Sequence, residues 1–469
     1  MGSGAGAAVL ILAAGEGKRL KSKTIKLLHP VAGRPMVRWV ADAVAALRPR
    51  RIVAVVGYQA DRVREALEGA CDAFAVQKEQ RGTGHAVLTA EREVGREGDL
   101  LIVSGDVPSL RPATLRALLA RKRRAKAAMA LVTASVPDPT GYGRIVRDGG
   151  RVARIVEHKD ATRAEREIRE INCGLYAVDA AKLFPLLKKL RPDNAQGEYY
   201  LTDAVHALIA KGDTVVALEH GEAAEVLGVN TRAELAEAGS ALYARKAGEL
   251  QDGGVTILDP SRTWVDPRAR VGQDTVLYPD VIIDGETVIG ADCVIHPGCR
   301  LIDMTLAAGV TIRDHCVLES SRIETGAVVG PFARLRPGAV LEADTRVGNF
   351  FELKKTRLGR GSKAQHLAYL GDAEIGPRCN VGAGTITCNY DGTAKHRTTL
   401  GEGVFVGSDT QFVAPVSVGE GAYIAAGATV TEDVPPGALA ISRARQVNLE
   451  GWVARRRAKS PAKAGSSHS

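Results

Sequence analysis

An aliphatic residue recurs at every sixth position through most of the second half of the chain. A period of six fits neither an amphipathic α-helix nor a strand with one buried face. It is typical of a parallel β-helix, in which each hexapeptide forms one side of a coil and its aliphatic side chain points inward. A small residue, often Gly, frequently follows and leaves room for a corner. The three runs are Val265, Val271, Leu277, Ile283, Ile289, Ile295 and Leu301, then Ile323, Val329, Leu335, Leu341, Val347 and Leu353, then Leu400, Val406, Phe412, Val418, Ile424 and Val430.

One segment of this region carries no repeat. Residues 388–399 read CNYDGTAKHRTT. Departures from the repeat of a solenoid are loops on one face, and that face is often the binding face. We therefore expect this loop to belong to a site.

The first half, from residue 7 to about 227, alternates strand and helix patterns. Such alternation predicts an α/β domain with a mostly parallel sheet covered by helices. Ligands of such sheets bind at the carboxyl ends of the strands. The expected strands are Ala8–Leu12, Arg51–Val56 and Asp99–Ser104, and the expected helices are Pro35–Leu47, Asp61–Glu68 and Pro112–Arg124.

A helix is expected between the two halves. Thr231 and Glu234 have the spacing of a capping box, and an apolar stripe continues to about Leu250. The sequence thus predicts an α/β domain over residues 1–230, a helical linker over 231–252, a β-helix over 253–450 and a basic, disordered tail over 451–469.

Charge and composition narrow the class of protein. The net charge is +9, and the tail holds five cations without an acid, so it is either a solvated end or a contact for nucleic acid or anionic lipid. The aromatic content of 4% argues against a stacking platform for nucleic acid. Seven cysteines without a CxxC pair argue for a reducing compartment. The longest apolar run, Ala7–Ala14, is too short to span a membrane. We expect a cytoplasmic protein with no nucleic-acid partner and no stable membrane insertion.

The first strand ends in a glycine-rich turn, Leu12-Ala13-Ala14-Gly15-Glu16-Gly17-Lys18-Arg19. Small residues let backbone N–H groups approach an anion, and Arg19 and Lys26 add positive charge. The spacing is neither that of a Walker A motif nor G-x-G-x-x-G. A tight turn without a ligand is the alternative.

The stretch LAAGEGKRLKSKTIK resembles the sugar-1-phosphate nucleotidyltransferases, which join a nucleoside triphosphate to a sugar phosphate and release pyrophosphate. That family usually has Thr, Met and Pro at Lys18, Leu20 and Ile25. The cations Arg19 and Lys26 are kept. The resemblance implies a Rossmann-like nucleotidyltransferase domain.

Later segments of the first half extend this resemblance. Residues 80–86 (QRGTGHA) resemble a uracil-reading segment, and a Gln amide offers the donor and acceptor that a pyrimidine edge needs. The resemblance implies catalytic roles for Arg19 and Lys26, and Asp106 and Asn230 as ligands of Mg²⁺, although Asp106 alone would also suit a helix N-cap. The implied UTP- and UDP-N-acetylglucosamine-binding residues are Leu12, Ala13, Ala14, Gly15, Lys26, Gln77, Gly82, Thr83, Gly141, Glu157, Asn172 and Asn230.

Candidate chemistry in the second half centres on His366, which lies three residues before Tyr369. A neutral imidazole can take a proton from an amine that attacks a thioester. Glu352 lies upstream and is a candidate to orient it. A surface histidine is the alternative for His366, and the nearby cations Arg336 and Lys354 could equally be solvated.

The run GPFARLRPG…GNFFELKK…AQHLAYLGDAEIG…NVGAGTITCNYDG…VFVGSDTQFVAP…AISR resembles the bacterial bifunctional N-acetylglucosamine-1-phosphate uridyltransferase/glucosamine-1-phosphate N-acetyltransferase family. The resemblance covers residues 7 to about 452 and implies a left-handed parallel β-helix and a homotrimer. The family usually has Gly at Gln365. The resemblance implies His366 as general base, Arg336, Lys354, Tyr369 and Asn380 as sugar-phosphate ligands, and Ala383, Asn389, Tyr390, Ser408, Ala426 and Arg443 as acetyl-CoA ligands.

The implied function is a two-step synthesis with Mg²⁺ as cofactor and acetyl-CoA and UTP as co-substrates. Acetyl-CoA acetylates glucosamine 1-phosphate, and UTP then converts N-acetylglucosamine 1-phosphate into UDP-N-acetylglucosamine, a precursor of cell-envelope polymers. Two alternatives remain. In one, only the nucleotidyltransferase works and the β-helix trimerises or regulates; in the other, the chain is a non-catalytic scaffold.

Overall fold

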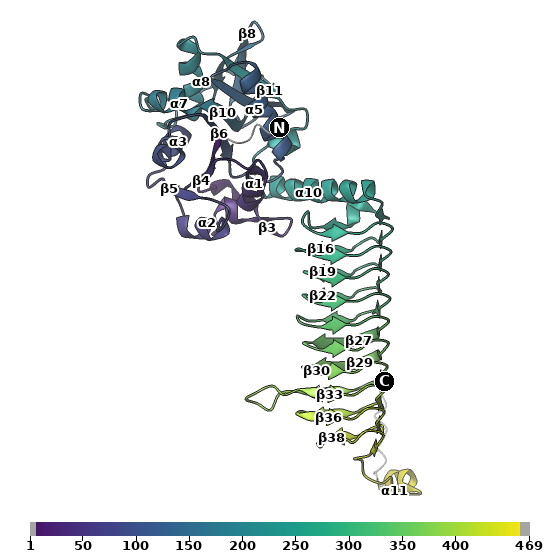
Figure 1. The fold of residues 1–469 in the computed structure, drawn as a ribbon. Coiled ribbons are helices and arrows are strands. Elements are labelled where there is room, and N and C mark those ends of the chain that lie inside the picture. Colours follow the sequence, from purple (N-terminus) through teal and green to yellow (C-terminus); the bar gives the residue numbers. More distant parts are fainter. Residues whose placement is uncertain (1–5, 460–469) are drawn as a thin grey trace, which may run out of the picture. The chain divides into compact units, whose positions relative to one another are not determined.

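The computed structural model describes residues 6–459, which belong to two compact units (Figure 1). The first unit runs to Glu249 and includes Val265–Pro267. The second contains Leu250–Trp264 and the chain from Arg268 onward. Each unit is described by itself.

The first unit is built on a sheet with the strand order β11-β7-β10-β6-β1-β4-β5. Strands β5, β4, β1 and β6 are parallel, as predicted, and all three predicted strands are present. The sheet is not parallel throughout, because β10 runs antiparallel between β6 and β7. The bounds are β1 (Ala8–Ala13), β4 (Arg51–Val56), β5 (Ala73–Val76), β6 (Asp99–Ser104), β7 (Met129–Ser135), β10 (Glu170–Asp179) and β11 (Val215–Glu219), with the hairpins β2 (Pro30–Val31)–β3 (Arg34–Pro35) and β8 (Arg144–Asp148)–β9 (Arg151–Val156).

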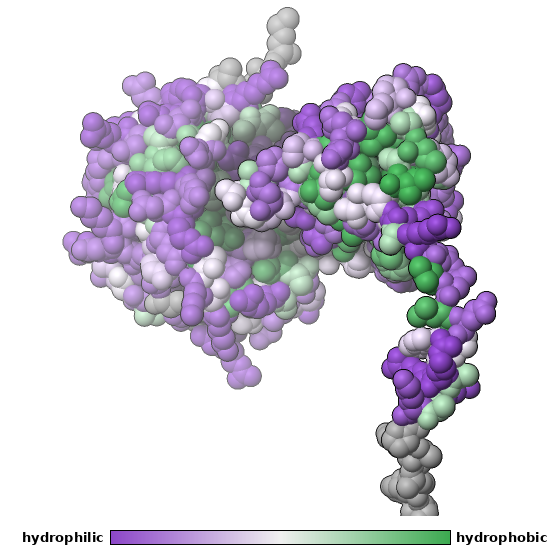
Figure 2. Space-filling model, turned by 90° about the horizontal axis from the view of Figure 1, so that it is seen from below, coloured by the Kyte–Doolittle hydropathy of each residue, from purple (hydrophilic) through white to green (hydrophobic). Residues whose placement is uncertain are grey.

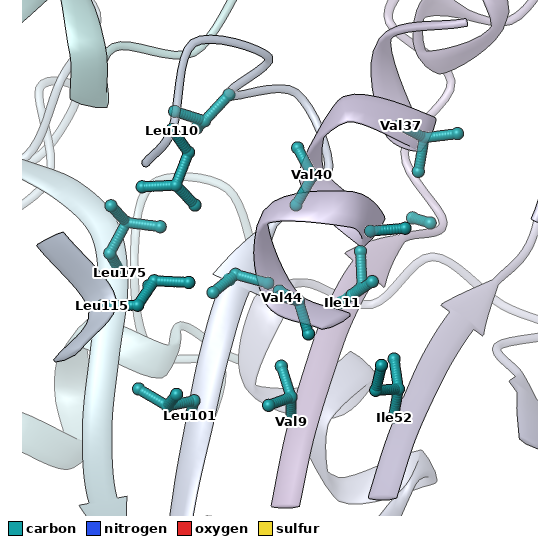
Figure 3. Packing of buried hydrophobic residues seen from close by; sticks show 14 of the residues in the cluster. Val9, Ile11, Val37, Val40, Val44, Ile52, Leu101, Leu110, Leu115 and Leu175 are labelled. Atoms are coloured by element: carbon teal, nitrogen blue, oxygen red, sulfur yellow. The ribbon is translucent and has the colours of Figure 1, made fainter. Parts of the chain in front are cut away.

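Apolar clusters cover both faces of this sheet. Successive side chains of a strand point to opposite faces, so Val9 and Ile11 enter one cluster and Leu10 enters the other. Figure 3 shows Val9 and Ile11 packed with Val40 and Val44 of α1. The three predicted helices are confirmed within a few residues. The helices are α1 (Met36–Ala45), α2 (Ala60–Ala66), α3 (Thr83–Thr89), α4 (Glu91–Val94), α5 (Pro112–Arg124), α6 (Arg163–Arg166), α7 (Ala180–Leu187), α8 (Leu201–Ala210) and α9 (Ala223–Val226), with 3-10 turns η1 (Lys18–Leu20) and η2 (Lys26–Leu28).

The strand order reverses at β1. The chain passes from β1 to β4 and β5 on one side, and then returns to place β6 on the other. The carboxyl ends of β1 and β6 are held together by the bond from the Gly105 amide to the Leu12 carbonyl (3.0 Å). A reversal of this kind opens a crevice for a ligand beyond the strand ends.

The second unit is a parallel β-helix, as the hexapeptide period predicts (Figure 1). Each coil has three sides, and equivalent strands of successive coils pair in parallel, for example Val276 with Val294 and Thr311 with Val328. Every residue of the three predicted runs is buried except Val271, which is half-buried. The corners need small residues: a Cβ on Gly407 would lie 2.5 Å from the backbone nitrogen of Ala426 in the next coil.

The strands of the β-helix are short. The first side holds β12 (Thr256–Ile257), β15 (Val276–Leu277), β18 (Val294–Ile295), β21 (Thr311–Ile312), β24 (Val328–Val329), β31 (Asn380–Val381), β34 (Phe405–Val406), β37 (Tyr423–Ile424) and β39 (Leu439–Ala440). The second holds β16 (Ile282–Asp284), β19 (Arg300–Ile302), β22 (Val317–Glu319), β25 (Arg334–Leu335), β32 (Ile386–Cys388), β35 (Gln411–Val413) and β38 (Thr429–Val430). The third holds β14 (Arg270–Val271), β17 (Val288–Ile289), β20 (Thr305–Leu306), β23 (Arg322–Ile323), β26 (Val340–Leu341), β28 (Arg357–Leu358), β30 (Ala373–Ile375), β33 (Thr398–Leu400) and β36 (Val416–Val418). Two longer strands, β27 (Arg346–Lys354) and β29 (Lys363–Gly371), continue from the first side round the corner into the second.

The predicted interruption is a loop that leaves the stack between β32 and β33 (Figure 1). Tyr390 and Lys395 form an antiparallel bridge in it, and the His396 amide donates to the Asn389 carbonyl (2.9 Å). The loop is therefore an ordered hairpin.

Helix α10 (Arg232–Asp252) begins with the predicted capping box. The Glu234 amide donates to Thr231 Oγ1 (3.2 Å), and the Glu234 carboxylate accepts from the Thr231 amide (3.0 Å). The box therefore fixes the backbone that directly follows Asn230.

The basic tail was expected to be disordered, and this is wrong for its first part. Helix α11 (Trp452–Lys459) forms there, because Ala, Arg and Lys favour helix and the Arg456 guanidinium lies 5.0 Å from the centre of the Trp452 ring, four residues away. Residues 460–469 of the predicted tail lie outside the described residues.

The C-terminal end of the β-helix carries hydrophobic side chains, shown in green in Figure 2, which looks up at this end. Leu439 and Ile441 of the last coil are each 59% exposed. A solenoid end normally carries a polar cap or is covered.

None of the helices in residues 6–459 is long and apolar enough to cross a membrane.

Candidate active sites

A cavity of about 360 Å³ opens at the carboxyl ends of β1 and β6. It is lined by the predicted nucleotide-binding residues Leu12, Ala14, Gly15, Lys26, Gln77, Gly82 and Thr83, and by the predicted metal ligand Asp106. Ala13 does not line it, because its side chain packs into the core under the sheet. The predicted residues Gly141, Glu157, Asn172 and Asn230 also lie outside its lining.

The segment predicted to read uracil is tied to both walls of this cavity. The buried Gln77 donates from Nε2 to the Gly82 carbonyl (3.1 Å) and lies 2.9 Å from His85 Nδ1. Gln80 Nε2 donates to the Ala14 carbonyl (2.8 Å). A side chain at Gly82 would lie 2.6 Å from the Tyr199 carbonyl oxygen, so only glycine fits there. The segment is thus held in place before any ligand arrives.

Two cations and two oxygen ligands meet at one edge of the cavity. Lys26 forms an ion pair with Asp106 and donates to Asn230 Oδ1 (2.8 Å), and Arg19 Nη2 donates to the same oxygen (2.7 Å). The Val229 amide donates to the Asp106 carbonyl (2.9 Å), and a Cβ on Gly228 would lie 3.0 Å from the Asp106 carboxylate. Close packing of residues 228–230 against Asp106 therefore brings the four side chains together.

These residues fit a magnesium ion. The carboxylate of Asp106 and the amide oxygen of Asn230 converge on one cation, the Lys26 ammonium, which stands where a metal would. Mg²⁺ is usually held by one or two protein oxygens together with phosphates and water. Within residues 6–459 no three His, Cys, Asp or Glu side chains gather into a cage of their own. The remaining ligands would come from the substrate.

Two departures from the nucleotidyltransferase pattern are accommodated near this cluster. Leu20 is 2% exposed and Ile25 is 1% exposed, so both fill the core beneath the turn. Ile25 has φ −56°, a value that the usual proline would also adopt. The backbone before Lys26 thus has the conformation that the proline usual in the family would also adopt.

Three of the predicted UDP-N-acetylglucosamine-binding residues lie close together: Glu157 directly follows β9, Asn172 is on β10, and Gly141 is in the loop before β8. The Asn172 amide donates to the Gly143 carbonyl (2.9 Å), and its side chain donates to the Tyr176 hydroxyl (2.6 Å). A Cβ on Gly143 would lie 3.4 Å from a carboxylate oxygen of Glu157. Gly141 lies next to the cation cluster, because a Cβ added at this position would be 3.7 Å from Arg19 Nη1.

Glu157 is half-buried, and its removal from water raises the pKa of its carboxyl group. The nearby carboxylates of Asp203 and Asp160 raise it further, whereas the hydrogen bond from Thr202 Oγ1 (3.0 Å) lowers it. The folded protein therefore keeps a proton on Glu157 at pH values where the unfolded chain has lost it.

This gives a testable pH dependence. Glu157 contributes most to stability below its ordinary pKa of 4.5, and the contribution falls as the pH rises through the raised pKa of the folded state. Glu157→Gln mimics the protonated form, so its Tm should gain relative to the parent protein as the pH rises above 4.5. Thermal unfolding measured across the pH range checks this. A constant Tm difference would contradict it.

In the β-helix, four predicted residues form one column at the corner between the first and second sides. The paired strands place His366, Ala383, Ser408 and Ala426 at equivalent positions of successive coils. The ladder continues through the corner, since the Asp409 amide donates to the Ala383 carbonyl (2.7 Å) and the Gly427 amide donates to the Ser408 carbonyl (2.8 Å). The Arg443 guanidinium donates to the Ala426 carbonyl at the end of the column. The column leads from an imidazole to a cation.

His366 is exposed at this corner and pairs in register with Asn349, not with Glu352. Its Nδ1 lies 3.3 Å from Asn349 Oδ1, and a proton on Nδ1 would leave Nε2 free to accept. Glu352 lies beside Tyr369 and forms an ion pair with Arg336 (3.0 Å). The suggestion that Glu352 orients His366 is therefore wrong, because a strand places side chains three residues apart on different parts of a coil.

The predicted phosphate cations lie at the next corner. Arg336 and Lys354 follow equivalent strands of neighbouring coils, and the Arg336 amide donates to the Leu353 carbonyl (2.8 Å). Lys395 of the hairpin faces the Lys354 ammonium and lowers the pKa of Lys354. Three cations at one corner form a place for an anion.

Tyr369 and Asn389 also meet at this corner, since a side chain on Gly371 would collide with both. Asn389 donates to the Asp372 carboxylate and is buried. Tyr390 is 59% exposed, and its hydroxyl donates to the Gly392 carbonyl (2.6 Å). Asn380 lies on the first side of the coil, paired with Lys363 and Phe405, so one chain does not bring it to Arg336 and Lys354.

Comparison with known proteins agrees with both units. The family model described as the MobA-like NTP transferase domain matches residues 9–250, the GMPPB C-terminal domain matches residues 261–358, and six bacterial transferase hexapeptide repeats match residues 397–432. The bifunctional protein GlmU of Pelobacter propionicus is 50% identical over 455 residues, which cover 96% of this chain and 99% of that protein. GlmU of an Anaeromyxobacter species is 51% identical, covering 96% and 93%, and GlmU of Brevibacillus brevis is 48% identical, covering 94% and 95%.

The chain belongs to the bifunctional GlmU family. This confirms the family predicted from the motifs of both halves. It also confirms the fold class, a nucleotidyltransferase domain followed by a left-handed β-helix of hexapeptide repeats.

Sequence reasoning missed Arg144 in this member of the GlmU family. The side chain is 1% exposed, and no carboxylate bonds to it in the described chain. Its guanidinium donates to the carbonyls of Tyr142 and Arg166 (3.4 Å to the latter) and lies 3.3 Å from His158 Nδ1. It thus ties the loop that carries Gly141 to the segment that follows Glu157. The sequence carried a signal, because Arg144 directly follows Gly141-Tyr142-Gly143, the loop that contains the predicted residue Gly141.

We expect Arg144→Met to lower kcat/KM for the sugar phosphate about tenfold, because Gly141 and Glu157 lose their common anchor. UTP affinity should change little. Steady-state kinetics with each substrate varied, and calorimetric titration of UTP, separate the two effects. Arg151→Met, at an exposed position of the same hairpin, is the control. Equal losses for UTP and sugar phosphate would indicate general destabilisation instead.

Proposed function

We propose that this protein makes UDP-N-acetylglucosamine in two steps at two sites. Residues 253–450 transfer acetyl from acetyl-CoA to glucosamine 1-phosphate, and residues 1–230 join the product to UTP and release pyrophosphate. Membership of the bifunctional GlmU family supports both steps. The order follows from the chemistry, because the acetylated sugar phosphate is the substrate of the second step.

In uridylyl transfer, the residues around the cavity bind, orient and neutralise charge. Gln77 and Gln80 hold the uracil segment, and Glu157 and Asn172 accept and donate hydrogen bonds to the sugar hydroxyls. Arg19 and Lys26 stabilise the charge that develops as the sugar phosphate attacks the α-phosphorus in line. Mg²⁺ held by Asp106 and Asn230 would neutralise phosphate charge there.

In acetyl transfer, His366 accepts a proton through Nε2 from the amine of glucosamine 1-phosphate as the amine attacks the thioester carbonyl. Asn349 orients the ring. Arg336, Lys354 and Lys395 bind the sugar phosphate, and Tyr369 and Asn389 contact the sugar. The column of Ala383, Ser408 and Ala426 carries the pantetheine arm, with Arg443 beside the coenzyme A phosphates.

One observation carries the second activity. A β-helix that only trimerises or regulates needs no imidazole in register with Ala383, Ser408 and Ala426, and no cluster of three cations at the next corner. The same geometry opposes the monofunctional alternative.

We propose a homotrimer, because Asn380 lies on a different side of the coil from Arg336 and Lys354 and can join them only from another copy. The exposed Leu439 and Ile441 at the end of the β-helix also call for a cover. Light scattering with size-exclusion chromatography tests this, and a monomer would exclude it. We place the enzyme in the cytoplasm, where UTP and acetyl-CoA are available.

Mass spectrometry of one mixture tests the function: protein, glucosamine 1-phosphate, acetyl-CoA, UTP and Mg²⁺. UDP-N-acetylglucosamine is the expected product. N-acetylglucosamine 1-phosphate alone would mean that the first domain is inactive. If neither product forms, N-acetylglucosamine 1-phosphate and UTP are supplied directly. Formation of UDP-N-acetylglucosamine would then mean that the β-helix does not transfer acetyl. No product from this mixture would overturn the whole proposal.

A further inference from the structure

The two oxygens that fit a metal ion are already occupied by a positive group of the chain itself. The Lys26 ammonium bonds to both Asp106 and Asn230, and Arg19 bonds to the same oxygen of Asn230. The side chains of Lys26 and Asp106 are only 13% and 20% exposed. The contacts are thus shielded from water, which strengthens them.

A magnesium ion and this ammonium cannot share the two oxygens. Mg²⁺ requires its ligands at about 2.0–2.1 Å in near-octahedral geometry, so it would take the space in which Lys26 Nζ lies. A metal ion and the Lys26 ammonium in contact with the same two oxygens would repel each other strongly in a half-buried site. Lys26 must therefore leave Asp106 and Asn230 before, or as, a metal binds.

The place to which Lys26 can move is next to it. Lys26 lines the nucleotide cavity, and a side chain at Gly17 of the glycine-rich turn would collide with the Lys26 side chain. The aliphatic part of Lys26 therefore packs against the turn that approaches the phosphates. A small rotation of its side chain moves the ammonium from the two oxygens towards an anion bound at the turn.

We propose that Lys26 is a resident cation that keeps Asp106 and Asn230 together until a nucleotide arrives. The triphosphate draws Lys26, with Arg19, away from the two oxygens, and the metal then enters with the phosphates as its remaining ligands. This inference rests on the proposed uridylyl transfer. It assigns to Lys26 a role in the binding order, in addition to its role in stabilising charge.

Two consequences follow for binding without turnover. The parent protein should bind a divalent ion weakly by itself and much more tightly with UTP, and the coupling must be reciprocal. Without the ammonium the oxygens are free, so Lys26→Met should bind the ion about tenfold more tightly than the parent protein when UTP is absent. The advantage should vanish when UTP is present.

The experiment uses Mn²⁺ as the probe and the electron paramagnetic resonance signal of free Mn²⁺ as the readout, on the full chain with and without UTP. Lys26→Met is compared with Lys23→Met, which removes an exposed lysine from the same segment and should behave as the parent protein. Lys26→Gln is the second variant, so that one failure to fold does not decide the outcome. Unchanged or weaker Mn²⁺ binding by folded Lys26 variants without UTP overturns the proposal.

Asp106→Ala separates this proposal from the function on which it rests. Without UTP, loss of Mn²⁺ binding is expected in that variant. With UTP, it should bind no more Mn²⁺ than UTP binds in the absence of protein. If Asp106→Ala binds Mn²⁺ as the parent protein does, the metal ligands themselves are wrongly assigned. A tight Asp106-dependent Mn²⁺ site in the parent protein without UTP would instead leave the ligands correct and exclude Lys26 as the resident cation.

Discussion

Replacing Asp106 by alanine is expected to lower uridylyl transfer about a thousandfold, because the loss of metal-ion charge stabilisation costs several kcal/mol in the transition state. Asp106 supplies the carboxylate that bonds to the Lys26 ammonium beside Asn230. Acetyl transfer should be unchanged, because its candidate residues all belong to the β-helix. Pyrophosphate release from UTP and N-acetylglucosamine 1-phosphate measures the first activity, and thiol release from acetyl-CoA measures the second.

The matched control for this substitution is Asp61→Ala. Asp61 lies on α2 with its side chain 97% exposed, and its pair with Arg64 is a surface contact of little energy. It should leave both activities unchanged. Parallel loss of both activities in Asp106→Ala would indicate unfolding, and retained uridylyl transfer would show that another group holds the metal.

The β-helix could be predicted in detail because its physics is local. A coil buries one aliphatic residue per side, so the six-residue period predicts the fold directly. The interruption at residues 388–399 can also be recognised, because the period is absent there. In the first half, the three predicted strands could be recognised because they are buried on both faces and are therefore continuous apolar runs. Strand β10 could not be recognised in this way, because its ten residues mix Glu170 and Asn172 with apolar positions. Its antiparallel direction depends on its neighbours β6 and β7.

The sites were harder to predict, because they depend on register between coils and loops. His366, Ala383 and Ser408 form a column only because the inserted hairpin between Asn380 and Phe405 leaves the corner in place. The pairing of Lys395 with Lys354 and the anchoring by Arg144 depend on contacts between distant segments. The spacing of residues along the sequence does not predict such contacts. Arg144 and the hairpin are visible in the sequence, but their contact partners are not.

Replacing His366 by alanine is expected to lower acetyl transfer by about 10²–10⁴-fold, the usual contribution of a positioned general base. Uridylyl transfer from supplied N-acetylglucosamine 1-phosphate should remain at the parent level. Thiol release from acetyl-CoA measures acetyl transfer, and pyrophosphate release measures uridylyl transfer.

His296→Ala is the matched control, because His296 stacks on Tyr278 in an early coil (ring centres 4.9 Å apart) and lies outside the column. It should leave acetyl transfer intact. Asn349→Ala tests the orientation of the imidazole: it should lower the rate less than His366→Ala, since the base remains but is held less firmly. If His366→Ala left acetyl transfer unchanged, the β-helix would be structural, and the monofunctional alternative would hold.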